Sequence, residues 1–272
     1  MSDLNAQTMP RKAKDVKAAF VPKLDAFLFA DFPNIELKIL AMYLEMIGWP
    51  SMADVFREGR DLHCESAAGA LGIPVEGMTD EQRQIGKTFN FSIVYGGGMP
   101  TLMRQLEVTA PEALSLLQGY HGQWPGIGWS TKRQKADPGT LIHMIESQVA
   151  ATKTDDEPGY IKTLYGRHLH PRSMHSALNA LCQGCAADLM KWAMEQVHDN
   201  LKAGGYRSHM VNTVHDELML DCAMDEIKDL SVLVPQWMTD PRIQASVPIV
   251  PDPEWSPTTW ADKRPCYPKE AA

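Results

Sequence analysis

One segment of the sequence has both of its ends marked, and it limits the fold more than any other. Thr79 and Gln82 have the S/T-x-x-E/Q spacing of a capping box, which begins a helix. The helix can continue to Tyr95, where Gly96-Gly97-Gly98 ends it. The segment therefore predicts a single well-defined helix.

Four side chains of this helix recur at intervals of four residues, namely Arg83, Lys87, Phe91 and Tyr95. Because four residues turn a helix by ~400°, the four side chains share one face. The face is cationic at one end and aromatic at the other, which suits a ligand with phosphates and a flat base. The alternative is an amphipathic helix that buries its aromatic rings and leaves its cations in solvent. The three following glycines weaken that alternative, because they let another backbone approach closely.

Acidic residues stand where two further segments end or turn. Residues 26–31 resemble a short buried strand that ends in Asp31, and residues 208–221 predict a hairpin that turns near His215-Asp216. Each acid alone is explained by a chain turn or an exposed hairpin tip. Together, Asp31 and Asp216 could hold two metal ions ~3.5–4 Å apart, the arrangement used in phosphoryl transfer. Hard oxygen ligands of this kind suit Mg²⁺.

The remaining elements predict an α+β fold. Helices are expected at 35–46, 61–71 and 184–202, and the Pro- and Trp-rich tail from Pro248 to Pro268 is expected to pack irregularly. Cys182 and Cys185 form a CxxC pair without a second ligand pair, so two small residues entering a helix are favoured over a zinc site.

The composition excludes several classes of protein. The 272 residues are 44% hydrophobic and 22% charged, which is ordinary for one large or two small globular domains and excludes disordered and fibrous chains. Five cysteines favour a reducing compartment, and neither a transmembrane run nor a secretory signal is present. We therefore expect a cytoplasmic protein.

The net charge of −8 bears on nucleic-acid binding. A protein that binds nucleic acid through its overall charge is normally basic, so here any nucleic acid would be held by local basic patches. Each patch taken alone is more simply explained as a solvated surface. The candidate patches are Arg11 to Lys17, Lys132 to Lys135 and Arg167 to Arg172.

The three main segments, in this order, resemble motifs A, B and C of the family A DNA polymerases. The Asp31 segment is similar to D-Y-S-Q-I-E-L-R, the Arg83 helix to R-x-x-x-K-x-x-N-F-G-x-x-Y-G, and residues 214–217 to V-H-D-E. Four connecting stretches are similar as well, and the resemblance extends from about Leu4 to about Asp262. The connecting stretches are Leu4 to Arg11, Asp61 to His63, Thr163 to Arg167 and Asn179 to Asp188.

The resemblance implies a right-hand polymerase fold, with an antiparallel palm sheet, helical fingers and no thumb. The palm would comprise residues 1–60 with motif A and 166–272 with motif C, and the fingers would comprise 61–165. The implied function is DNA-directed DNA polymerase, with two Mg²⁺ ions as cofactors and primed template DNA and dNTPs as partners. The thumb and the upstream palm would come from a second polypeptide, as the other part of a split or truncated phage-type enzyme.

The resemblance also implies roles for individual residues. Asp31 and Asp216 would be the metal ligands, with Glu217 near the metals, and Lys87 would donate a proton to pyrophosphate. The remaining roles concern the nucleotide and the DNA. Arg83, Lys87 and His63 would grip the phosphates, Phe91 would lie by the sugar, Tyr95 would stack at the template base and Glu36 would exclude ribonucleotides, while Arg167, Asn179, Gln183 and His215 would contact primer-template.

Two other functions remain open on the sequence. A metal-dependent nuclease or phosphohydrolase could use Asp31 and Asp216, but it needs no base-stacking face on the 83–95 helix. A non-catalytic DNA-binding or assembly subunit is the other alternative, and it would gain nothing from intact acids.

Overall fold

The structure is a computed structural model that describes residues 14–128, 136–243 and 246–266. The Leu4 to Arg11 stretch and the basic run at 132–135 lie outside the described residues. The chain divides into two compact units. Unit 1 comprises Met1–Ile35, Ala187–Gln244 and Ile249–Ala272, and unit 2 comprises Glu36–Ala186 and Ala245–Pro248. The expected palm and finger boundaries stay a prediction, because units defined by internal contacts need not coincide with functional subdomains.

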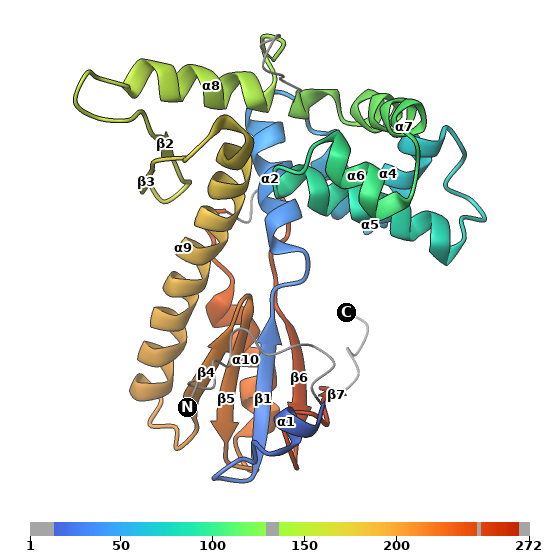
Figure 1. Cartoon of the computed structure of the whole chain (residues 1–272). Helices are drawn as coiled ribbons and strands as arrows, with labels where there is room; N and C mark the ends of the chain where they lie inside the picture. Colours follow the sequence, from blue (N-terminus) through green and yellow to red (C-terminus); the bar gives the residue numbers. More distant parts are fainter. Residues whose placement is uncertain (1–13, 129–135, 244–245, 267–272) are drawn as a thin grey trace. The chain divides into compact units, whose positions relative to one another are not determined.

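Unit 1 is built on an antiparallel sheet. Among the residues that the structure describes, five strands lie in the order β4-β5-β1-β6-β7 (Figure 1). In chain order the strands are β1 (Ala26–Asp31), β4 (His209–Val214), β5 (Glu217–Cys222), β6 (Asp252–Ser256) and β7 (Arg264–Pro265). The hairpin predicted to turn at His215-Asp216 is confirmed by the pairing of Val214 with Glu217.

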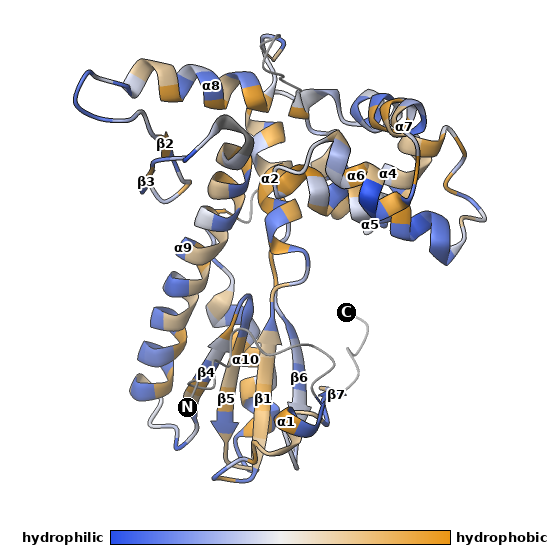
Figure 2. Cartoon of the chain, in the orientation of Figure 1, coloured by the Kyte–Doolittle hydropathy of each residue, from blue (hydrophilic) through white to orange (hydrophobic). Residues whose placement is uncertain are grey.

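The core of unit 1 lies around the central strand β1. Its first five residues are all buried, and the strand has hydrophobic colours over most of its length in Figure 2. Because side chains alternate across a strand, Phe27 and Phe29 share one face, where they pack with Met219 and Trp260. Helix α10 (Ile227–Met238) packs against β1 and β6. The short helix α1 (Lys14–Ala18) precedes the sheet in the chain.

Unit 2 is mainly helical. It holds α2 (Ile35–Met46) from its second residue onward, and α9 (Met174–Ala203) begins in unit 2 and continues into unit 1. The other elements of unit 2 are α3 (Ser51–Arg57), α4 (Leu62–Leu71), α5 (Asp80–Val94), α6 (Met99–Leu106), α7 (Ala110–Gln123), η2 (Pro125–Ile127), α8 (Leu141–Thr152), β2 (Ile161–Lys162) and β3 (His168–Leu169). Helices α4 and α5 pack against each other, and α4 also packs against α7.

The capping box expected at the start of α5 is confirmed. The Thr79 hydroxyl accepts a hydrogen bond from the Gln82 N–H, and the Gln82 side chain accepts one from the Thr79 N–H at 2.9 Å. The helix ends before Gly96, whose φ of +71° is left-handed. Gly86 lets α5 approach α4 closely, because a Cβ at this position would lie 1.9 Å from the His63 carbonyl oxygen. The ends and the packing of α5 are therefore defined by a few local residues.

Two expectations from the sequence were wrong. The helix expected at 184–202 begins ten residues earlier, at Met174. Gly184 does not mark its start but lies inside α9, where the missing side chain leaves room for Leu169. The tail expected to be irregular contains β6 and β7. Pro253 is tolerated in β6 because its outer neighbour β7 is only two residues long, so β6 is nearly an edge strand.

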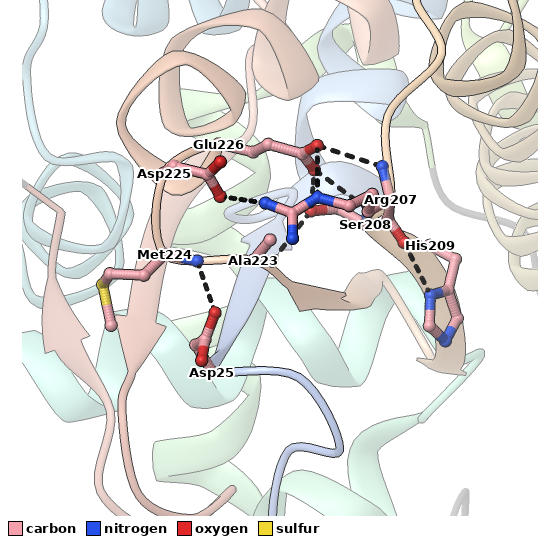
Figure 3. A network of polar contacts seen from close by, with 8 residues as sticks. All are labelled: Asp25, Arg207, Ser208, His209, Ala223, Met224, Asp225 and Glu226. Carbon is pink, nitrogen blue, oxygen red and sulfur yellow. Dashed lines mark hydrogen bonds and ion pairs between the residues drawn. The ribbon is translucent and has the colours of Figure 1, made fainter.

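A polar network ties together three loops at the end of the sheet where β1 begins. The Glu226 carboxylate accepts hydrogen bonds from the N–H groups of Arg207 and Ser208, both at 3.0 Å, and from the Ser208 hydroxyl at 2.6 Å. The Asp25 carboxylate accepts one from the Met224 N–H at 2.8 Å. Figure 3 shows the whole network, which comprises Asp25, Arg207, Ser208, His209, Ala223, Met224, Asp225 and Glu226.

The predicted α+β class is confirmed, with an antiparallel sheet and a largely helical second part. Within the described part of the chain, no helix combines the length and the apolar character that crossing a membrane requires.

Candidate functional site

Three acidic residues of unit 1, Asp31, Asp216 and Glu217, lie where β1 and β5 adjoin at the other end of the sheet. Asp31 is the last residue of β1, and the antiparallel register places it opposite Glu217, the first residue of β5. The Phe32 N–H donates a hydrogen bond to the Asp216 carbonyl oxygen at 3.1 Å, which continues the ladder into the hairpin turn. Asp31 and Asp216 therefore come from adjacent chain segments, as the two-metal hypothesis requires.

The hairpin turn carries local backbone strain. His215 has a φ of +57°, in the left-handed region that non-glycine residues rarely adopt. Such strain costs of the order of 1–3 kcal/mol and tends to occur at functional sites. The turn has two residues, His215 and Asp216, so this backbone conformation fixes where the Asp216 side chain leaves the chain.

Lys263 provides a positive charge beside these acids. Its ammonium forms an ion pair with Glu217, lies 3.5 Å from a carboxylate oxygen of Glu254 and lies 4.4 Å from the centre of the Phe29 ring. Burial raises the pKa of Glu217, while Lys263 acts to lower it and Asp31 acts to raise it further. Lys263 thus compensates part of the negative charge at this end of the sheet.

The donor set of this end of the sheet fits a hard divalent cation. In the described part of the chain, no three or more His, Cys, Asp and Glu residues form a group that could hold a metal ion by themselves. Mg²⁺ seldom uses such all-protein sites, because it keeps several waters and binds through one or two carboxylates together with substrate phosphates. Two carboxylates from adjacent segments, Asp31 and Asp216, match that mode of binding.

The predicted stripe on α5 lies in unit 2. The rings of Phe91 and Tyr95 stack with centres 5.9 Å apart and planes inclined by 15°. Phe91 is half-buried, whereas Tyr95 is 46% exposed, so the aromatic end of the stripe is not simply core. The Tyr95 hydroxyl donates a long hydrogen bond, 3.4 Å, to the Glu36 carboxylate of α2. The structure therefore brings Tyr95 and Glu36 together.

The cationic end of the stripe lies beside the start of α4. Asp61 caps α4 by accepting the N–H groups of His63 and Cys64, and it also accepts the Arg83 Nε–H at 2.8 Å. Burial acts to raise the pKa of Asp61, but the Arg83 guanidinium and the cap hydrogen bonds hold it below its usual value. Asp61 therefore fixes Arg83 of α5 against the N-terminus of α4.

The electrostatics of His63 reflect the same neighbourhood. Burial, with the nearby cations Arg83 and Lys87, lowers the pKa of His63 from 6.5 to about 4, against the opposing effect of Asp61. The His63 ring lies 6.0 Å from the Phe91 ring. His63 is thus grouped with the α5 stripe as an imidazole that is neutral at pH 7.

Three of the four expected DNA contacts lie in unit 2. Asn179 and Gln183 are one turn apart on α9, which places them on one face, and Gln183 is exposed. The Arg167 guanidinium donates to the Gly184 carbonyl oxygen at 2.8 Å, beside Gln183. His215 belongs to the hairpin turn of unit 1.

The CxxC pair faces the interior. Cys182 and Cys185 are buried within α9, and the Cys185 sulfur lies 3.0 Å from the Tyr43 hydroxyl. Both cysteines pack as small buried side chains, and they lie inside the helix rather than at its start.

Sequence reasoning missed three residues of these sites. Asp61 and Asn90 stood inside quoted motifs but received no role, although Asp61 binds Arg83 and Asn90 contacts His63. The DLH spacing and the helix N-cap position could have indicated Asp61. Nothing in the sequence indicates Lys263, because its contacts with Glu217 and Glu254 depend on the folded sheet.

Comparisons with known proteins agree with these features. Residues 1–262 match the model of DNA polymerase family A. DNA polymerase I of Pseudomonas aeruginosa is 31% identical over 245 residues, which cover 84% of this chain and 25% of the relative. DNA polymerase I of Geobacillus stearothermophilus is 29% identical, and the match covers 96% of this chain and 29% of the relative. The chain thus spans between a quarter and a third of the length of these curated relatives.

A solved structure has the same fold. The polymerase domain of Pol1 from M. smegmatis, in complex with DNA primer-template and dNTP, matches with a TM-score of 0.79 and 26% identity. The match covers 96% of this chain and 45% of that chain.

Proposed function

Because the chain belongs to DNA polymerase family A, we propose that it catalyses DNA-directed DNA synthesis, the template-directed transfer of a nucleotide to a primer 3′-hydroxyl. The single observation that carries the proposal is the meeting of Asp31 and Asp216 at one end of the antiparallel sheet. The palm- and fingers-like fold expected from the sequence is confirmed by the likeness to a polymerase domain. The relatives are three to four times as long as this chain, so polymerase activity of this chain by itself is what we propose.

We propose that Asp31 and Asp216 hold two Mg²⁺ ions. Family A DNA polymerases use divalent metal ions, and the two carboxylates are the donors that Mg²⁺ prefers. When bound, the ions supply the charge that activates the 3′-hydroxyl and stabilises the leaving pyrophosphate. Glu217 acts beside these ligands, and its ion pair with Lys263 limits how much negative charge the carboxylates add to the site.

The helix α5 supplies the groups proposed to bind the incoming dNTP. Arg83 and Lys87 contact its phosphates together with His63, since phosphoryl transfer depends mainly on positioning and charge stabilisation. Asp61 holds the Arg83 side chain in place for this contact. The Lys87 ammonium is the proposed proton donor to the leaving pyrophosphate.

The aromatic end of α5 is proposed to recognise the sugar and the base. Phe91 lies by the sugar, and Tyr95 provides an exposed ring for stacking at the template base position. Glu36 excludes a ribose 2′-hydroxyl, and its hydrogen bond from Tyr95 limits its freedom to move aside. A nuclease has no use for such a stacking face, which supports synthesis over hydrolysis.

Primer-template binding is proposed for the face of α9 that carries Asn179 and Gln183, together with Arg167 beside it. Asn179 and Gln183 share that face, and Arg167 is anchored to it through the Gly184 carbonyl. His215 contributes from the hairpin turn. A second polypeptide that supplies a thumb, a phage origin and a cytoplasmic location stay predictions from the sequence. The second polypeptide is tested by adding a thumb-bearing polymerase fragment to this chain and measuring whether the affinity for primed DNA rises.

The proposed function is tested by following a labelled primer on templates that differ at one position. We expect addition of only the complementary dNTP, in the presence of Mg²⁺. Shortening of the primer without any addition would support a nuclease instead, and binding with neither change would support a non-catalytic subunit. The Lys87→Ala variant separates dNTP binding from DNA binding, because it should weaken dNTP use far more than DNA binding. The control variant Lys202→Ala, at the end of α9, should change neither.

A further inference from the structure

A buried polar network connects α4, α5 and α7 within unit 2. The Asn90 side-chain oxygen accepts hydrogen bonds from the Ser66 hydroxyl at 2.8 Å and the Tyr120 hydroxyl at 3.0 Å. The Ser66 oxygen in turn accepts the Trp124 indole N–H at 3.0 Å. Asn90, Ser66 and Tyr120 have no exposed surface, so every proton in this network must find its acceptor inside the protein.

The direction of these hydrogen bonds orients the Asn90 amide. An indole N–H only donates, so the Ser66 oxygen acts as acceptor for Trp124 and its own proton is left to point at Asn90. The Tyr120 proton points at the same oxygen. If the amide were reversed, its NH₂ group would face both hydroxyls, and their two protons would lose the buried acceptor. The network therefore turns the Asn90 NH₂ group toward His63.

The Asn90 nitrogen lies 3.0 Å from the Nδ1 atom of the His63 ring. An amide NH₂ group only donates, so Nδ1 must be the acceptor, and in a neutral imidazole the proton then resides on Nε2. We propose that Asn90 is a positioning residue that holds His63 as the Nε2–H tautomer, so that the ring presents one directed N–H donor to a phosphate oxygen. The role of the phosphate rests on the proposed function, but the tautomer does not.

The arrangement has a chemical consequence for phosphate binding. Arg83 and Lys87 bring positive charge, whereas His63 brings a neutral donor whose direction is set by a rigid network. The opposite tautomer would turn a lone pair at Nε2 toward the phosphate and repel it. Asn90 therefore acts through His63 and has no contact of its own with the nucleotide.

The tautomer is measured directly by long-range ¹H–¹⁵N correlation NMR on the full chain labelled at histidine, at pH 7.5. The chain has nine histidines, so the His63→Gln variant identifies the signal by its loss. We expect the Nε2–H pattern. An Nδ1–H pattern or a doubly protonated ring at this pH would overturn the proposal, whether or not the chain has polymerase activity.

The Asn90→Asp variant tests the cause. A carboxylate of the same shape still accepts from Ser66 and Tyr120 but faces Nδ1 with an acceptor, so His63 should change to carry its proton on Nδ1. The matched control is Asn200→Asp in unit 1, where the amide donates to the Gln196 carbonyl at 2.8 Å, and His63 should keep its tautomer. An unchanged His63 signal in folded Asn90→Asp would also overturn the proposal.

The functional consequence is read from nucleotide incorporation. Asn90→Asp should raise the KM for dNTP about tenfold or more, the loss expected for a hydrogen bond to a charged group. In the His63→Ala background, which has no side chain that residue 90 could orient, the same change should raise KM much less. Equal effects in both backgrounds would contradict action through His63. If the parent chain incorporates no nucleotide, the proposed function fails while the NMR result still decides the tautomer.

Discussion

Individual residues of this chain perform distinct tasks because their neighbours fix them. Tyr95, directly after α5, and Glu36 of α2 illustrate this, because a long hydrogen bond of 3.4 Å joins an exposed ring to a carboxylate. His63 illustrates it in a buried setting, where an amide rather than a charge determines what the imidazole can offer. All three residues are candidates for contact with the nucleotide, and each can be tested alone.

Glu36→Ala should raise incorporation of ribonucleotides relative to deoxyribonucleotides, because the side chain that would meet a 2′-hydroxyl is removed. Tyr95→Phe should have a smaller effect in the same direction, since it removes only the hydroxyl that holds Glu36. The measurement is the ratio of kcat/KM for rNTP and dNTP on one template. An unchanged ratio in Glu36→Ala would remove this role from Glu36.

The stability of the chain should depend on pH through its buried histidines. The pKa of His63 falls on folding from 6.5 to about 4, and that of His121 also falls to about 4, in both cases chiefly through burial. The unfolded chain therefore binds more protons between these values, so stability is lost as the pH falls from 6.5 toward 4. Each histidine should cost roughly 2 kcal/mol between pH 7 and 5.

The pH effect is measured by denaturant unfolding at pH 7 and pH 5. His63→Gln should lose clearly less stability over this interval than the parent chain, because glutamine does not titrate. His121→Gln is the matched comparison and should reduce the loss in the same way. A parent chain whose stability is the same at both pH values would contradict the burial of neutral imidazoles.

At the scale of elements, the two ends of β1 carry different sets of polar contacts. The end with Asp31 carries the acids and Lys263, whereas the end with Asp25 carries the network of Figure 3. In that network Glu226 accepts three hydrogen bonds from the chain entering β4, so it joins the start of α10 to β4. Burial opposes ionisation of Glu226, but the Ser208 hydroxyl and backbone N–H groups hold its pKa below the usual value.

Glu226→Ala should lower the free energy of unfolding by about 2–3 kcal/mol, because two backbone N–H groups and a hydroxyl lose a charged acceptor. Asp225→Ala is the control. Its ion pair with Arg207 joins side chains that are 73% and 61% exposed, so its loss should cost less than about 1 kcal/mol. Thermal or urea unfolding compares the two variants, and equal losses would refute the difference assigned to them.

How much of each element the sequence predicts depends on where its determinants lie. The capping box of α5, its stripe and the hairpin at His215-Asp216 were predicted because local residues determine them. The early start of α9 and the strand β6 were not predicted. Gly184 disfavours a helix and Pro253 disfavours a strand, and tertiary packing prevails over these local preferences. The contacts of Lys263 and Asn90 arise only in the folded units, so no local pattern indicates them.

At the scale of the whole molecule, each unit carries different groups that the proposed nucleotidyl transfer would use. Unit 1 carries two carboxylates on adjacent segments of its sheet, and unit 2 carries a helix with a cationic and an aromatic end. Membership of DNA polymerase family A explains why one chain of 272 residues has both. The central claim is that the acids of unit 1 make the chain a polymerase.

The most direct test of this claim is primer extension with Mg²⁺ and four dNTPs, comparing the parent chain with Asp216→Asn. Asp25→Asn is the matched control, because Asp25 directly precedes the other end of β1, where its carboxylate accepts a hydrogen bond from the Met224 N–H (Figure 3). We expect extension by the parent chain and by Asp25→Asn, and a loss of at least about a thousandfold in Asp216→Asn, since a ligand of the catalytic ions is removed. Extension by Asp216→Asn at the parental rate would contradict the account.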